Sequence, residues 1–217
     1  MELTANTTFS TGRLYRIALG LAIFTIIYNT IEGLVSTWFG YEDGTLSLFG
    51  FGADSFIEVV SGIGIAHMVL RIQHNHNSKR DKFERTALKI TGYSFYILVA
   101  GLVITSVYNI YTGHKPATTF WGVIISIISM AAMGFLAIGK TRTGRQLNSE
   151  AILADAECTK VCIYMSVILL ISSIIYELTS FQYIDSIGTL GLSYFAFTEG
   201  KECFEKAKGD EHCSCKH

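Results

Sequence analysis

The chain has 217 residues, of which 50% are hydrophobic and 16% are charged, and its formal net charge is −1. Soluble domains usually carry about 25% charged residues, and a near-neutral chain offers no electrostatic basis for binding nucleic acid. Long, nearly uncharged stretches alternate here with short polar segments. This pattern argues against a soluble protein and predicts an all-α, polytopic membrane protein.

Six apolar stretches are long enough to cross a bilayer, which takes about 20 residues per helix. In chain order they cover residues 14–39, 46–72, 86–111, 120–139, 150–178 and 184–204. The polar segments between them are an acidic turn at 41–45, a basic loop at 74–85, a turn at 112–119, a basic loop at 140–149 and a turn at 179–183. We therefore predict a bundle of six transmembrane helices over residues 14–207. A polar tail precedes it at 1–13, and a cytoplasmic tail with Cys and His residues follows at 208–217.

The orientation in the membrane follows from the positions of Lys and Arg. These residues concentrate in the loops 74–85 and 140–149 and at both ends of the chain, whereas the other three turns contain one lysine, Lys115. Because basic residues favour the cytoplasmic side, we predict that both termini are cytoplasmic. The first apolar stretch is too long for a secretory signal and lacks a small-residue cleavage site. The default location is the cell membrane, as a multi-pass protein of the cytoplasmic membrane.

Two acids lie one helical turn apart in the second apolar stretch, at Asp54 and Glu58. A charged residue at the centre of a membrane helix costs about 2.5–3.5 kcal/mol on insertion scales. On one helix face the two carboxylates also repel each other unless a cation lies between them. The pair therefore indicates an ion pathway. The alternative is that the acids lie near a helix end, where they are hydrated or paired with Lys160.

Two thiols have the same spacing in the fifth apolar stretch, at Cys158 and Cys162. A lone intramembrane cysteine usually packs as a small hydrophobe, and that explanation also fits here. Together with Asp54 and Glu58, however, the cysteines supply two oxygen and two sulfur donors, which is enough for a tetrahedral metal site. Thiolates favour Zn²⁺ or Cd²⁺ over Mg²⁺ or Ca²⁺. Zn²⁺ is our first choice.

Three segments resemble motifs of the cation diffusion facilitator, or cation efflux, family. GTLSLFGFGADSFIE (44–58) is similar to its second-span motif, LADAECTKVCIYMS (153–166) to its fifth-span motif, and FQYIDSIGTLGLSYFAFTEGKECFEKA (181–207) to its closing pattern. The resemblance covers roughly residues 14–207. It implies a transport site on Asp54, Glu58, Cys158 and Cys162, with Glu, Cys and Cys where the family has Asp, His and Asp. These departures leave a transport role in place and change the expected metal preference.

The resemblance also implies an activity. Relatives are typically proton-coupled metal exporters that work by alternating access, and most carry a cytoplasmic metal-binding domain after the sixth span. Only about a dozen residues follow it here, so we expect a member limited to the transmembrane domain. A homodimer stays open as a prediction, and the expected lack of that domain weakens the case for a dimer held together by it. We expect a carrier rather than an enzyme, without a prosthetic group, whose partners are a divalent metal cation, protons and the lipid bilayer.

Secondary candidates and rival functions stay open at this point. Asp155, in the matched Ala-Asp-Ala segment, is a candidate for shaping the cavity entrance. The C-terminal donors His212, Cys213, Cys215 and His217 form either a flexible metal-binding set or a disordered polar end. The rival functions are a membrane thiol oxidoreductase that uses Cys158 and Cys162, and a metal sensor that binds without transport. No phosphate-binding loop for an ATP-driven pump is present.

Overall fold

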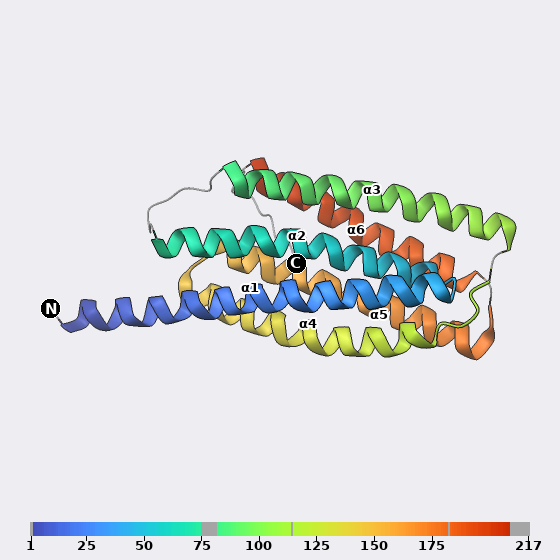
Figure 1. Ribbon diagram of the computed structural model, residues 1–217, viewed down its shortest axis with the longest axis horizontal. Coiled ribbons are helices and arrows are strands. Elements are labelled where there is room, and N and C mark those ends of the chain that lie inside the picture. The colour runs from blue at the N-terminus through green and yellow to red at the C-terminus, as the bar shows by residue number, and fades with distance from the viewer. Residues whose placement is uncertain (1, 75–81, 114, 182, 209–217) are drawn as a thin grey trace.

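The computed structural model describes residues 2–74, 82–113, 115–181 and 183–208, and in these ranges it contains helices and no strands. The six helices are α1 (Glu2–Glu42), α2 (Leu46–His74), α3 (Lys82–Thr112), α4 (Phe120–Leu147), α5 (Glu150–Thr179) and α6 (Ile184–Lys208). They run alternately up and down in one elongated bundle, so that α1 begins and α6 ends toward the same end (Figure 1). The predicted all-α helical bundle is confirmed.

The side chains are distributed as expected for a protein that lies in lipid. The helices have 25–41 residues, which at 1.5 Å per residue exceeds the roughly 30 Å of a bilayer core. Large apolar side chains cover the outside, including Ile31, Trp38, Ile97 and Phe135, while the interior contains many Ser, Thr, Asp and Glu residues. Because the apolar surface faces outward and the polar groups face one another, the bundle is suited to a membrane.

Length and composition identify only five of these helices, α1 to α5, as candidate membrane spans. Helix α6 falls short of the prediction of six apolar spans because its sequence is more polar. Four of its polar residues are nevertheless buried in the bundle: Asp185, Thr189, Ser193 and Glu199. Helix α6 packs mainly against α3 and also contacts α5 and α2. It is therefore part of the bundle, and its polarity reflects contacts with protein rather than with lipid.

One predicted boundary was wrong, and one helix is longer than the predicted span. The segment 140–149 was expected to be a basic loop, but α4 continues to Leu147 and only Asn148 and Ser149 connect it to α5. Asn148 ends α4 in the left-handed conformation, with φ of 47°, and Ser149 caps α5 by accepting a hydrogen bond from the backbone of Ile152. At the other end, α1 begins at Glu2, so the helix also includes most of the expected N-terminal tail.

Acidic side chains cap two helices at the end of the bundle where α6 begins. Asp185 accepts hydrogen bonds from the backbone amides of Leu46 (2.8 Å) and Ser47 (3.1 Å) at the start of α2. Glu177 likewise accepts from the amide of Thr119 (2.5 Å) beside the start of α4. A helix N-terminus has unpaired N–H groups and a partial positive charge, so carboxylates stabilise it. These caps tie α6 to α2 and α5 to α4.

Gly52 allows α1 and α2 to approach closely. A Cβ atom added at Gly52 would lie 2.7 Å from the backbone nitrogen of Thr37, which cannot move aside as a side chain can. We expect Gly52→Ala to destabilise the protein by about 1–3 kcal/mol through overpacking, measured as a lower melting temperature in detergent. The matched control is Gly20→Ala in α1, where a Cβ meets nothing within 4 Å and the alanine should stabilise the helix. Equal effects of the two substitutions would contradict the close approach.

Candidate metal centre

A cavity of about 30 Å³ lies inside the bundle, and all six helices contribute to its lining. This volume accommodates about one water molecule or a dehydrated ion. Among the described residues, the lining carries four carboxyl side chains and one lysine. The carboxyl groups belong to Asp54, Glu58, Asp155 and Glu199, and the thiols of Cys158, Cys162 and Cys203 also reach the cavity. An excess of acids in a cleft or cavity attracts cations.

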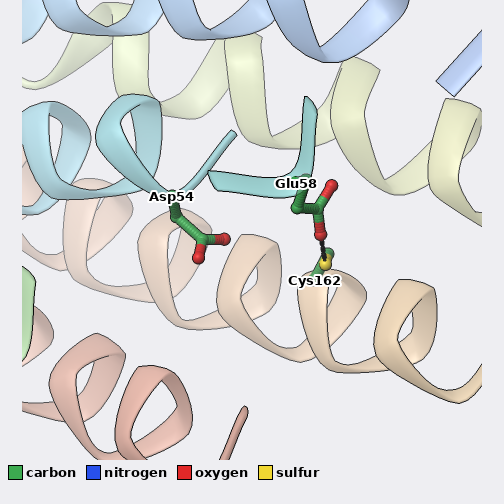
Figure 2. A group of neighbouring side chains, drawn as sticks. All are labelled: Asp54, Glu58 and Cys162. Carbon is green, nitrogen blue, oxygen red and sulfur yellow. Dashed lines mark hydrogen bonds between the residues drawn. The ribbon is translucent and has the colours of Figure 1, made fainter. Parts of the chain in front are cut away.

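Asp54, Glu58 and Cys162 converge in this cavity from two helices (Figure 2). One ligand atom from each residue lies within 4.8 Å of the others. Asp54 and Cys162 are buried, with exposed fractions of 4% and 5%. Protein ligands bind Zn²⁺ at about 2.0–2.3 Å, so small side-chain rotations would bring all three donors to one ion. Three of the four ligands that we predicted therefore form one candidate metal centre.

The two carboxylates of this centre have different surroundings. Glu58 accepts a hydrogen bond from the side-chain amide of Asn29 in α1 at 2.6 Å, and the Cys162 thiol donates to its other oxygen. The contact from Asn29 comes from outside the donor group, and contacts of this kind fix the orientation of metal ligands. The Oδ1 atom of Asp54, in contrast, is buried without a hydrogen-bond partner in the described part of the chain. An unsatisfied buried carboxylate oxygen is costly, and a bound cation would remove this cost.

Cys158 lines the same cavity but points to a different set of donors. Its sulfur lies within 4.8 Å of carboxylate oxygens of Glu199 and Glu202, both in α6. The regular spacing of Cys158 and Cys162 predicted a shared helix face, and it contained no information about the third helix that packs against that face. The four predicted ligands therefore belong to two neighbouring groups, one between α2 and α5 and one between α5 and α6.

Lys140 and Asp155 form a buried ion pair at the cavity. The Lys140 ammonium lies 2.9 Å from Asp155 and also donates to the Thr159 hydroxyl at 2.9 Å. Lys140, which we expected in a basic loop, is only 2% exposed. Residues 140–147 contain no proline and one glycine, so nothing in this segment ends a helix at residue 139. This was the signal that the prediction missed. Asp155, which we expected to shape the cavity entrance, thus has the Lys140 ammonium group as its partner.

The remaining predictions have separate outcomes. Lys160 pairs with Glu157 at 2.6 Å near the surface, so its partner is not one of the buried acids of α2. Cys158 and Cys162 are thiols and not a disulfide. The C-terminal donors His212, Cys213, Cys215 and His217 lie outside the described residues. Sequence reasoning did not connect two further residues with the predicted ligands: Glu199, which lines the cavity, and Asn29, which donates to Glu58.

Comparison with known families gives one match. A family model of the cation efflux transmembrane domain matches residues 22–207, which is well over half of the chain. The match runs from the second half of α1 to the last turn of α6 and includes both groups of donors. The family transports metal cations and its members are not enzymes. The chain therefore belongs to the cation efflux family and is a multi-pass membrane protein that transports metal cations.

Proposed function

We propose that the protein exports a divalent heavy-metal cation, with Zn²⁺ as the first choice, from the cytoplasm across the cell membrane in exchange for protons. The observation that carries this proposal is the convergence of Asp54, Glu58 and Cys162 in an acid-lined cavity inside the bundle. A structural metal site would not need to lie inside a membrane bundle. Intramembrane acids of this kind usually mark the path of an ion.

The chemistry of the donors supports a borderline or soft ion. Two carboxylates and one thiolate suit Zn²⁺, and Cd²⁺ is the closest competitor because the thiolate favours softer ions. Mg²⁺ prefers oxygen ligands and retains several waters, which a cavity of about 30 Å³ does not accommodate. The fourth position around Zn²⁺ is available to a water molecule or to a small movement of Cys158.

In alternating access, the metal centre is open to only one side of the membrane at a time. Toward the end where α2 and α6 begin, the bundle is filled by an apolar cluster of Leu48, Phe51, Ile125, Met165, Leu169 and Leu192. Toward the opposite end, a second cluster contains Ala18, Met68, Val69 and Ile152. We infer that these two clusters open alternately as α2 and α5 shift with their ligands, while the ion stays between them.

Proton exchange follows from the ligands themselves. A thiol and a carboxyl group must lose their protons to bind a metal, so metal affinity falls as the pH falls. On an acidic outer side, protons would displace the ion, and the protonated centre would return to the inside. The direction of transport then depends on the pH gradient, because the same groups bind either the metal or the protons.

Metal flux in sealed proteoliposomes tests the proposal. The purified chain is reconstituted, a fluorescent indicator reports Zn²⁺, Cd²⁺, Mn²⁺ or Mg²⁺, and a pH gradient is applied or omitted. We expect Zn²⁺ and Cd²⁺ flux that the gradient accelerates, accompanied by proton movement in the opposite direction. Metal binding without flux would support the sensor instead, and a disulfide between Cys158 and Cys162 that cycles with oxidant would support the oxidoreductase.

A further inference from the structure

We propose that Glu32 of α1 carries a proton in the exchange, releasing it when the metal binds and taking it up again when the metal leaves. This inference rests on the proposed export and extends it to a residue that does not bind the metal. Glu32 is buried, with 6% exposed. Among the described residues it belongs to neither group of donors and does not line the cavity. Acids inside a membrane bundle usually mark the path of an ion or a proton.

The surroundings of Glu32 contain hydroxyl groups and no cation. Its Oε1 atom accepts a hydrogen bond from the Tyr28 hydroxyl at 2.8 Å, and its Oε2 atom accepts from the Ser55 hydroxyl at 3.1 Å. Ser129 of α4 is a further hydroxyl neighbour. In the described part of the chain, no ion pair joins Glu32 to a basic side chain. A buried carboxylate without a cation is costly, so a proton is the cation that neutralises it.

The neighbouring hydroxyl of Ser55 allows Glu32 to hold and to release a proton in the same place. A hydroxyl group both donates and accepts. Ser55 has two acceptors within reach, Glu32 and the backbone oxygen of Phe51, each at 3.1 Å. When Glu32 is ionised, Ser55 donates to it. When Glu32 is protonated, its O–H group donates to the Ser55 oxygen and Ser55 donates to Phe51, so both forms are hydrogen-bonded.

Two matched contacts connect Glu32 to the metal centre. Asn29 and Glu32 are three residues apart on one face of α1, and Ser55 and Glu58 have the same spacing on α2. Asn29 donates to Glu58, and Ser55 donates to Glu32. Glu32 also lies close enough to Asp54 and Glu58 for their negative charges to repel one another. Without the metal this repulsion favours a proton on Glu32, whereas a divalent cation at the centre favours the carboxylate.

The other charged groups around Glu32 leave this role to it. Helix α1 packs mainly against α2 and α4. In the ranges that the structure describes, its ionisable neighbours are Tyr28 on α1 and the ligands Asp54 and Glu58 on α2. The charged residues of α4 begin at Lys140, which has an acid partner of its own. Glu32 lies about 4.5 Å beyond the level of Glu58, toward the end that the loop charges predict to be outside. A proton from that side therefore reaches it before the metal centre.

Proton release on metal binding tests the inference without transport. The full-length protein in weakly buffered detergent solution is titrated with Zn²⁺, and a pH indicator counts the protons released per bound ion. We expect Glu32→Gln to release about one proton fewer than the natural protein, because one titrating carboxyl group is gone. Glu32→Asp, which keeps a carboxyl group, should restore the natural number. The matched control is Glu42→Gln, because Glu42 is an exposed acid on the same helix that accepts from Trp38.

The variant Tyr28→Phe tests the same carboxyl group while leaving it in place. It removes a hydroxyl that donates to the ionised form of Glu32. The protonated form is then favoured, so proton release should persist to a pH roughly one unit higher than in the natural protein. A purely structural role of Glu32 would not move this pH profile.

The inference is overturned if Glu32→Gln releases as many protons as the natural protein, if Glu32→Asp releases as few as Glu32→Gln, or if Tyr28→Phe leaves the pH profile unchanged. In proteoliposomes, Glu32→Gln should lose the acceleration of flux by the pH gradient. It should keep the exchange of labelled for unlabelled Zn²⁺ at equal pH, because its metal ligands are intact. If flux through the natural protein ignores the gradient, the proposed exchange fails, and the proton count in detergent still decides the role of Glu32.

Discussion

Replacement of Asp54 by asparagine is expected to abolish metal transport and, at the same time, to stabilise the metal-free protein. Asparagine keeps the size and shape of the side chain and removes its charge. Loss of a residue that only supports a metal ligand typically costs 10–100-fold in affinity, so loss of a ligand charge should cost at least about 100-fold. The metal-free protein should gain roughly 1 kcal/mol, because the substitution removes a buried charge that lies one helical turn from the carboxylate of Glu58.

The two effects are measured on the same preparations. Flux of Zn²⁺ is followed in proteoliposomes, and the melting temperature is followed in detergent with and without Zn²⁺. The natural protein should be stabilised by Zn²⁺, by about 2.7 kcal/mol at 100 times the dissociation constant, and Asp54→Asn should show much less of this stabilisation. Glu157→Gln is the matched control, because Glu157 is an exposed acid paired with Lys160. An Asp54→Asn protein that transports Zn²⁺ normally would remove Asp54 from the site.

The length of the apolar stretches predicted the helices well, because a membrane helix must satisfy its own backbone and face lipid along most of its length. The polar helix α6 shows the limit of that signal. Its residues Asp185 and Glu199 are buried against other helices, and composition alone does not distinguish this arrangement from a water-exposed helix. The same limit explains Lys140, which a basic loop would place in water and which in fact pairs with Asp155 inside the bundle.

The sequence predicted the residue types of the candidate metal centre, but it predicted only in part which residues come together there. The spacing of Asp54 and Glu58 placed two carboxylates on one face of α2, and Cys162 meets them there. The position of Cys158 depended on the way in which α6 packs against α5, which leaves no periodic pattern in α5. The contact of Asn29 with Glu58 was equally hidden, because it joins residues 29 positions apart. Contacts between helices, and not features within one helix, decide these details.

Replacement of Cys162 by aspartate is expected to change the preferred metal. The family resemblance places a carboxylate at this position, and the substitution converts one sulfur and two oxygen donors into three oxygen donors. Soft ions lose their preferred ligand, so affinity for Cd²⁺ should fall by about 100-fold. Mn²⁺, which suits carboxylates, should gain relative to Cd²⁺, and Zn²⁺ should change least. Three carboxylates in one buried centre also repel one another, so the metal-free variant should be less stable than the natural protein.

Competition between metals measures this change most directly. Flux of Zn²⁺ is recorded at increasing Cd²⁺ or Mn²⁺, and the concentrations that halve the flux are compared for Cys162→Asp and the natural protein. Cys203→Ser is the matched control, because Cys203 is a buried cysteine that lines the same cavity but lies outside both donor groups among the described residues. It should leave the order of metals unchanged. If Cys162→Asp and Cys203→Ser retain the same preference for Cd²⁺, the thiol of Cys162 does not bind the transported ion. If both lose that preference, the softness of the site does not depend on Cys162 alone, and the centre extends along α6 beyond the residues that we assign to it.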